Sequence, residues 1–170
     1  ENLKKINERF DALILTAAKT EFYDLKKFKS FKPELFKKII DVNLTNQYSI
    51  IYYLLKNLKK KSHIVFISSV ASKNAIGSNA AYSAAKAAIN NLALFFSRAL
   101  AGKVYVNSIA PGLMRTKLTK KFKKDYFKKY QDRTLSKKLT NPVNVADFIL
   151  YLINKNNNIT GQTIFIDGGC

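Results

Sequence analysis

The sequence predicts one α/β domain built on a mainly parallel β-sheet. Short apolar runs of strand length alternate with longer stretches of helical periodicity along the whole chain, which is the pattern of units that form parallel sheets. The chain has 170 residues, of which 47% are hydrophobic, so it is long and apolar enough to bury a sizeable core. These observations exclude an intrinsically disordered chain.

The first half of the chain supplies two strands and one long helix. We expect the first strand at residues 12–15 and the second at residues 64–67, whose uninterrupted apolar run is typical of a strand covered on both faces. Between them, apolar residues recur at helical spacing from Pro33 to Leu55. This periodicity predicts a long crossover helix that closes in the cationic cluster 56–61.

The second half supplies two more helices and two more strands. Residues 80–100 are rich in Ala and free of Gly and Pro, which predicts a long helix ended by Gly102. A third strand is expected at residues 103–109, a last helix from Asn141-Pro142 onward, and a final strand at residues 162–166. We find no internal repeat and no low-complexity linker.

The cysteine and histidine content excludes several kinds of site. The single cysteine, Cys170, excludes a disulfide framework and a thiolate-rich zinc site, and it favours a reducing compartment. With one histidine, His63, the chain lacks the usual ligands of a metal site, so we expect no metal. Its apolar runs are far shorter than the roughly 20 residues of a transmembrane helix. We therefore expect a cytoplasmic protein with no membrane partner.

The charge balance is strongly basic. Thirty Lys and Arg against eleven Asp and Glu give a net charge of +19, which would attract nucleic acid, an acidic membrane surface or an acidic protein. Arg is scarce among these residues, and Lys, Asn, Ile and Phe are all abundant, as an AT-rich coding sequence would produce. We therefore favour compositional drift over recruitment of a partner by charge alone. We expect no nucleic-acid partner, because no recognised nucleic-acid module accompanies the charge.

A tyrosine–lysine pair in the predicted helix 80–100 is the candidate catalytic group. Tyr82 and Lys86 are four residues apart, so their side chains leave the same face of the helix. An ammonium so placed would lower the pKa of the phenol from about 10 and suit it to acid–base work. Ser69 stands at the carboxyl end of a predicted strand, the edge at which open α/β sheets bind their ligands. Its hydroxyl would hydrogen-bond a substrate carbonyl there and polarise it. Taken alone, the pair is more typical of an exposed lysine on a lysine-rich helix.

Together with their neighbours, these residues resemble the short-chain dehydrogenase/reductase family. The resemblance covers the whole chain and implies a Rossmann-like, doubly wound parallel sheet in three layers, of which this chain holds the C-terminal part, strands four to seven in family order. In block spacing the chain is similar to the small carbonyl-reducing members, which include the 3-oxoacyl-acyl-carrier-protein reductases. The matching blocks, in the family's order, are Asp11–Leu15, Asp41–Leu44, Ile64–Ser69, Ala81–Lys86, Val106–Gly112 and Ile159–Gly169.

The resemblance implies a role for each matching position in an enzyme that uses NAD or NADP. Tyr82 would be the general acid/base, Lys86 would hold the nicotinamide ribose and lower the tyrosine pKa, and Ser69 would orient the carbonyl or alcohol of a small-molecule substrate. Asn43 would anchor the water through which Lys86 exchanges protons with solvent, in a locally opened helix. The other positions implied to bind the cofactor are Thr16, Ala17, Pro111, Gly112, Met114 and Thr116.

Residues 117–138, called here the lid segment, match the position of the family's mobile substrate lid. The segment carries ten basic and two acidic residues, a net charge of +8 in 22 residues. It is interpreted as a lid that closes over substrate, or as a docking face for an acidic acyl carrier protein. The alternative interpretation, without a functional role, is a solvent-exposed amphipathic helix with Phe122, Tyr126 and Tyr130 packed beneath it.

Two departures from the family pattern concern the cofactor. The family binds the pyrophosphate on a glycine-rich turn after its first strand, and this chain has no glycine before Gly77. The missing part, roughly the first third of a usual member, would also choose between NAD and NADP. Where relatives carry Asn-Asn-Ala-Gly, this chain carries Leu15-Thr-Ala-Ala18, which weakens the contact to the cofactor's ribose.

Three explanations of the missing part stay open. The sequence begins at Glu1 without Met, which favours an N-terminal part that is disordered, cleaved or omitted. The second explanation is a shortened, cofactor-free relative that serves as an interaction or structural subunit, and the third is completion of the cofactor half by a partner chain. Without this part, the first strand of the chain would present an edge that another strand normally covers.

The helices at residues 80–101 and 142–154 are those with which such enzymes form dimers and tetramers, so a homo-oligomer, and above all a homotetramer, is expected. The apolar residues expected to point outward from these helices are Leu92, Phe95, Phe96, Ile149 and Leu152.

Overall fold

The computed structural model describes residues 2–23 and 29–170, and its strands form a four-stranded sheet. Each neighbouring pair of strands is parallel. The predicted α/β class is therefore confirmed, and each predicted strand is present with boundaries shifted by at most six residues. In spatial order the strands are β1 (Phe10–Leu15), β2 (Leu58–Ile67), β3 (Val104–Pro111) and β4 (Thr163–Ile166).

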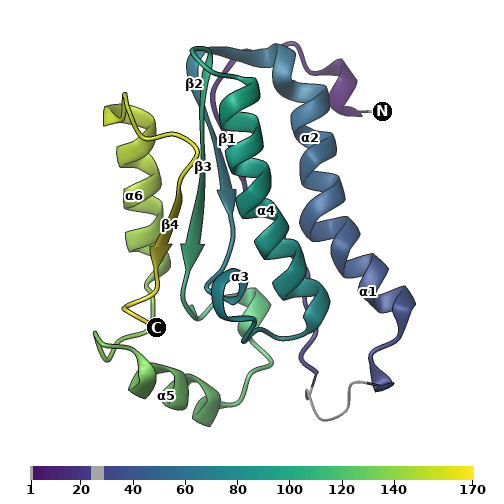
Figure 1. Cartoon of the computed structure of the whole chain (residues 1–170), viewed down its shortest axis with the longest axis vertical. Coiled ribbons are helices and arrows are strands. Elements are labelled where there is room, and N and C mark those ends of the chain that lie inside the picture. Colours follow the sequence, from purple (N-terminus) through teal and green to yellow (C-terminus); the bar gives the residue numbers. More distant parts are fainter. Residues whose placement is uncertain (1, 24–28) are drawn as a thin grey trace.

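Helices cover both faces of the sheet and give the expected three-layer, doubly wound arrangement (Figure 1). One face is covered by α1 (Pro33–Ile40), α2 (Asn46–Leu54) and α4 (Ala80–Ala99). The opposite face is covered by α6 (Pro142–Lys155). Two further helices, α3 (Ala71–Asn74) and α5 (Lys124–Arg133), lie at the end of the sheet to which the strands point.

Two apolar clusters fill the spaces between these layers, and β2 contributes to both. Because side chains alternate along a strand, Ile64 and Phe66 pack toward α4, whereas Val65 packs toward α6. All three side chains are at most 1% exposed. The prediction that this strand is covered on both faces is confirmed.

The predicted crossover helix is interrupted and ends earlier than expected. A π-helical turn, Asp41–Thr45, separates α1 from α2, and a 3-10 turn follows at Leu55–Asn57. The π-helical turn inserts one residue into the helical repeat and the 3-10 turn tightens it, and a periodicity of apolar positions reveals neither change. The helix is also not closed by the cationic cluster, because three of its lysines, Lys59 to Lys61, belong to β2.

Backbone pairing outweighs charge repulsion at this end of β2 because the three lysine side chains are exposed to solvent. Lys59 also forms an ion pair with Asp11 on β1, with 2.9 Å between Nζ and the carboxylate. The register between the two strands shifts in this region, and Lys61 adopts a positive φ of 64°. The lysines therefore extend the strand without entering the core.

The expectation of five outward-facing apolar residues on α4 and α6 is wrong for three of them. Phe96, Ile149 and Leu152 are 8%, 7% and 0% exposed and belong to the two core clusters. Leu92 is partly buried against the core, whereas Phe95 is 58% exposed. The helical period was right, but the sequence alone did not show which of several adjacent apolar stripes meets the sheet.

Candidate active site

A cavity of about 720 Å³ lies at the carboxyl ends of the strands. Parallel sheets place their ligands at this edge, where the loops after neighbouring strands converge. Residues from the ends of β1, β2 and β3, from the start of α4 and from the lid segment line it. Eight of the predicted site residues are among them: Thr16, Ser69, Tyr82, Lys86, Pro111, Gly112, Met114 and Thr116.

Ser69 is held in place by backbone hydrogen bonds on both sides. The amide of Ser68 donates to the carbonyl of Ile109 at 2.7 Å, and the amide of Val70 donates to the carbonyl of Pro111 at 2.9 Å. The hydroxyl of Ser72 donates to the Ser69 carbonyl at 2.6 Å. The turn after β2 is therefore locked to the turn after β3, and it presents the Ser69 hydroxyl to the cavity.

Tyr82 and Lys86 project from the first turns of α4, which begins at a strong capping residue. The side-chain oxygen of Asn79 accepts a hydrogen bond from the Tyr82 amide at 2.8 Å and so fixes the start of the helix. The Lys86 side chain is 1% exposed. Its Nζ lies 5.5 Å from the centre of the Tyr82 ring and donates to the Ile67 carbonyl at 2.7 Å.

Burial dominates the protonation of both groups. It raises the pKa of the Tyr82 phenol above its usual value of 10.0, and a side-chain hydrogen bond from Ser69 acts in the opposite direction. Burial also lowers the pKa of Lys86 from 10.5 to about 8. The expected lowering of the Tyr82 pKa by Lys86 is therefore not what this structure shows, since desolvation of the phenolate is the larger effect.

Asn43 and Ala17 do not line the cavity, because both belong to a brace behind it. The Asn43 side chain, fully buried in the π-helical turn, donates to the carbonyls of Lys19 at 2.7 Å and Ile39 at 2.8 Å. One turn later, the Gln47 side chain donates to the Ala17 carbonyl at 2.9 Å. Together the two amides fix the segment that follows β1.

The turn after β3 has no room for a larger residue at Gly112. A Cβ atom there would lie 2.7 Å from Thr140 Oγ1, 2.8 Å from the Tyr130 hydroxyl and 3.0 Å from the backbone of Asp167. Further along, Thr116 caps the 3-10 turn Lys117–Thr119 through a reciprocal capping box. The segment from Gly112 to Thr116, which runs along the cavity wall, is therefore fixed at both ends.

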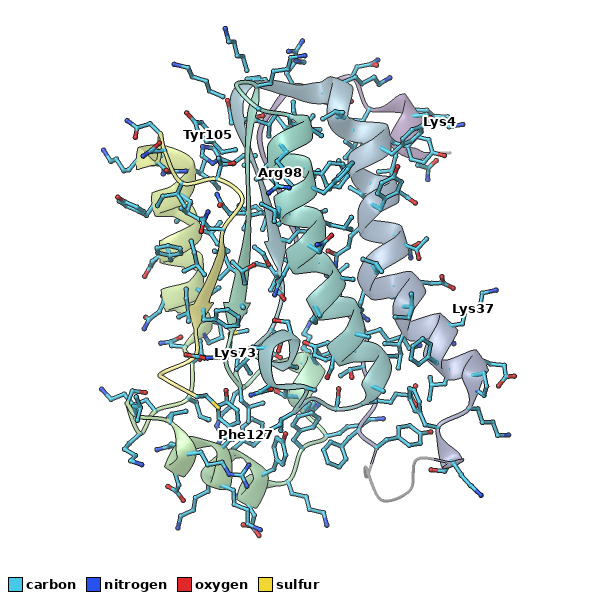
Figure 2. All side chains as sticks on the ribbon, viewed as in Figure 1. Lys4, Lys37, Lys73, Arg98, Tyr105 and Phe127 are labelled. Atoms are coloured by element: carbon cyan, nitrogen blue, oxygen red, sulfur yellow. The ribbon has the colours of Figure 1, made fainter. Side chains whose placement is uncertain are left out.

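The lid segment covers the cavity with an aromatic inner face. Phe122, Tyr126 and Tyr130 line the cavity, and Phe127 on α5 is 4% exposed. Phe127 lies between α5 and the ends of the strands (Figure 2), and the Arg115 guanidinium stacks over its ring at 4.3 Å. Burial, together with contacts to Cys170, raises the pKa of Tyr130.

Sequence reasoning missed several residues that shape the site. Asn79 stands directly before the Ala-rich helix, a position where Asn is a recognisable capping signal. Gln47 lies one helical turn after Asn43, so its position on the same face was also visible in the sequence. Thr20, Ile76, Gly77 and Ser78 also line the cavity, but they lie in irregular segments whose path no periodicity predicts.

The part of the chain that the structure describes contains neither a metal-binding group of side chains nor a membrane-spanning helix. In ranges 2–23 and 29–170, no three His, Cys, Asp or Glu side chains are grouped so as to hold a metal ion. None of the helices in these ranges is long and apolar enough to span a bilayer.

Comparisons with known proteins give consistent matches. A family model described as Enoyl-(Acyl carrier protein) reductase matches residues 1–170. Acetoacetyl-CoA reductase from Acinetobacter sp. (strain RA3849) is 29% identical over 150 residues, which cover 84% of this chain and 59% of that protein. The 3-oxoacyl-(acyl-carrier-protein) reductase FabG from Buchnera aphidicola subsp. Baizongia pistaciae (strain Bp) is 32% identical over 146 residues, which cover 82% of this chain and 59% of that protein.

Among solved structures, the Pseudomonas aeruginosa RhlG/NADP active-site complex superimposes with a TM-score of 0.84 at 26% identity. The match covers 95% of this chain and 66% of that chain. This chain thus spans 59% of the length of the two sequence relatives and 66% of the solved structure.

Proposed function

The chain belongs to the short-chain dehydrogenase/reductase family, and from this premise we propose that the protein is an NAD(P)-dependent oxidoreductase that reduces a carbonyl group or oxidises the corresponding alcohol. The observation that carries the proposal is the convergence of Ser69, Tyr82 and Lys86 on one cavity at the carboxyl ends of the strands. Three groups suited to polarising, protonating and stabilising a reacting oxygen meet there from two different elements.

The residues present fit the nicotinamide end of such a cofactor. The hydroxyls of Thr16 and Thr116 and the amino group of Lys86 line the cavity together, a donor set suited to a ribose and a carboxamide. We propose that these three residues, with the backbone of Pro111, Gly112 and Met114, hold that end. This chain has no glycine before Gly77, so a glycine-rich cradle for the pyrophosphate is not among its N-terminal residues.

The proposed mechanism divides the work among three side chains. A bound nicotinamide supplies the hydride for reduction and accepts it in oxidation. The Ser69 hydroxyl donates a hydrogen bond to the substrate carbonyl and polarises it. The Tyr82 hydroxyl donates its proton to the oxygen as negative charge develops there, which leaves a phenolate. The Lys86 ammonium stabilises this phenolate, and in oxidation the same proton returns to Tyr82.

Asn43 is proposed to act behind these groups. Its π-helical turn departs from α-helical hydrogen bonding, and its side chain fixes the segment after β1. We assign to this turn the water that returns protons from solvent to Lys86, as the family resemblance implies.

We further propose that the substrate is a 3-oxoacyl group or a similar small carbonyl compound on an acidic carrier protein. Relatives named for acyl-carrier-protein and CoA substrates match most of this chain. The lysines on the outer face of the lid segment are exposed, which suits electrostatic docking of an acidic carrier. The exposed cations that we assign to this face are Lys120, Lys121, Lys124, Lys128 and Lys129.

Charge reversal on the lid segment tests the carrier. We expect Lys124→Glu with Lys128→Glu to raise KM for a carrier-bound substrate about tenfold and to leave KM for a small-molecule thioester of the same acyl group unchanged. Equal effects on both substrates, or none on either, would contradict docking of a carrier at this face.

The protein is proposed to work as a cytoplasmic homo-oligomer, with a homotetramer as the favoured state. Phe95 on α4 and Leu150 and Tyr151 on α6 are each more than half exposed, which leaves apolar surface on the two helices expected to form the contacts. Light scattering of the purified protein tests this, and a monomer at micromolar concentration would contradict it.

Direct titration tests the cofactor. NADPH and NADH are added to the intact protein, its mass verified, while nicotinamide fluorescence is followed. We expect saturable binding of at least one of them and weaker binding by Lys86→Ala, which loses the ribose contact. Absence of binding by the folded protein would contradict the enzyme proposal and favour a cofactor-free interaction subunit. If Lys86→Ala bound the cofactor with unchanged affinity, only the proposed contact between Lys86 and the ribose would be contradicted.

A further inference from the structure

Phe22 lies in an irregular segment after β1 and makes two ring contacts with the lid segment. Its ring centre is 5.7 Å from that of Phe122 and 5.8 Å from that of Tyr126, and both pairs meet edge to face. The Phe22 side chain is nevertheless 56% exposed. The large apolar side chain of Phe22 therefore packs against the lid segment and not into the hydrophobic core.

The backbone that carries Phe22 is fixed to the rigid part of the molecule. The amide of Tyr23 donates to the Ser78 carbonyl at 2.8 Å, and the Asn79 side chain donates to the Glu21 carbonyl at 2.7 Å. Asn79 is also the capping residue of α4, the helix that carries Tyr82. The ring of Phe22 is thus presented to the lid from the same framework that positions the proposed catalytic residues.

The two rings that Phe22 contacts are themselves part of the cavity wall. Phe122 and Tyr126 line the cavity and touch each other edge to face at 5.2 Å. The opposite side of the lid is held differently, through Phe127 beneath the Arg115 guanidinium. Phe22 therefore joins the β1 side of the cavity mouth to a lid whose other attachment comes from the β3 side.

We propose that Phe22 is a positioning residue, a clasp that holds the lid segment closed over the cavity. It acts through Phe122 and Tyr126 and does not itself line the cavity. Edge-to-face ring pairs each contribute a modest stabilisation, so the loss of both is expected to raise the open fraction of the lid about tenfold. The lid would then open without any change in the framework that carries Tyr82 and Lys86.

Limited proteolysis measures this opening without reference to activity. The lid segment contains nine lysines and one arginine, so trypsin cleaves it when it opens, and mass spectrometry assigns each cut. We expect Phe22→Ala to speed cleavage within residues 117–138 about tenfold relative to cleavage elsewhere, and Phe22→Tyr, which keeps the ring, to cleave at the wild-type rate. Tyr52→Ala is the matched control, because Tyr52 on α2 is 68% exposed and contacts Tyr53 edge to face at 5.2 Å.

Three outcomes would overturn the clasp. They are an unchanged rate of lid cleavage in Phe22→Ala, an equal acceleration of cleavage inside and outside the lid segment, and the same acceleration in Tyr52→Ala. The second outcome would show that the variant loosens the whole fold. None of these readouts depends on the enzymatic proposal.

A kinetic measurement extends the test, and it rests on the proposed function. With the lid held less firmly, Phe22→Ala is expected to raise KM for the carbonyl substrate about tenfold, while the cofactor Kd stays at the wild-type value and Phe22→Tyr restores KM. A parallel loss of cofactor binding, or an unchanged KM with faster lid cleavage, would show that the clasp does not serve the substrate.

Discussion

At the scale of the residue, burial sets the protonation of the proposed catalytic pair. Lys86 is almost completely buried, and its amino group donates to the Ile67 carbonyl rather than to a carboxylate. The pKa of Lys86 is therefore lowered to about 8, and that of Tyr82 is raised. A ligand that brings polar groups to Lys86 would raise its pKa again and so strengthen the ammonium form that stabilises a Tyr82 phenolate.

The lowered pKa of Lys86 predicts a rise in stability with pH. Between the folded pKa of about 8 and the ordinary value of 10.5, the unfolded chain binds a proton that the folded chain does not. The free energy of unfolding should therefore increase by about 2 kcal/mol from pH 8 to pH 10 through this group. Below pH 8 the group is protonated in both states, and its contribution is constant.

Chemical denaturation of wild type and Lys86→Met at pH 7, 8, 9 and 10 measures this contribution. The variant removes the titrating group and keeps most of the buried volume, so it should lack the rise attributed to Lys86. Parallel pH profiles for the two proteins would show that Lys86 does not titrate in this window.

The residues of the site were predictable to different degrees. Ser69, Tyr82 and Lys86 were visible because their order and spacing are carried by regular elements, and the structure brings them to one cavity. Phe22 was not visible, because its partners lie about 100 positions away in the sequence and no local pattern links it to them. Burial of Lys86 was also hidden, since the same spacing is typical of exposed lysines.

At the scale of the element, α4 connects the site to its surroundings through Asn79, the residue that caps its first turn. The Asn79 oxygen caps the helix, while its amide nitrogen donates to Thr20 Oγ1 at 3.1 Å and to the Glu21 carbonyl at 2.7 Å. One side chain therefore fixes both the start of the catalytic helix and the segment that bears Phe22.

Replacement of Asn79 separates these two tasks. Asn79→Ala should lower the free energy of unfolding by about 1 kcal/mol through loss of the cap alone, with a further loss from the broken tethers. Asn79→Asp keeps the capping oxygen and loses the donors, so it should be less destabilised than Asn79→Ala while releasing the loop. Thermal and urea denaturation of both variants checks the order, and wild-type stability of Asn79→Ala would contradict it.

Element boundaries show what local patterns miss. The crossover helix was predicted from its apolar period, which gave no sign of the π-helical turn at Asp41–Thr45; only the family resemblance implied a local opening at Asn43, whose side chain reaches the Lys19 carbonyl. The start of β2 was misplaced for the opposite reason. A run of lysines lacks any strand signal, yet pairing with β1 extends the strand to Leu58. Tertiary contacts decided both boundaries.

At the scale of the whole molecule, the alternation of strands and helices was enough to predict a parallel sheet with both faces covered. The order β1-β2-β3-β4 leaves β1 at one side of the sheet, paired with β2 alone in the part of the chain that the structure describes. The sequence did not determine what covers this edge of the sheet. The three explanations given for the missing glycine-rich part stay predictions.

The net charge of +19 predicts a stabilising effect of salt. Like charges repel in the compact state, and within residues 2–23 and 29–170 the structure shows one ion pair, between Lys59 and Asp11. Added salt screens this repulsion over about 10 Å at 0.1 M, so Tm should rise by several degrees between about 20 and 200 mM NaCl. Differential scanning fluorimetry measures this shift. A Tm that falls or stays constant would mean that attraction between opposite charges outweighs the repulsion between like charges.

The central claim is that Tyr82 transfers the proton to and from the substrate oxygen in the cavity it shares with Ser69 and Lys86. Its most direct test is single-turnover carbonyl reduction by the intact protein and by Tyr82→Phe, with cofactor affinity measured in the same samples. We predict that Tyr82→Phe loses at least about a hundredfold in rate and keeps a nearly wild-type cofactor Kd, because only the proton donor is removed. Turnover by Tyr82→Phe within a few-fold of wild type would contradict the account.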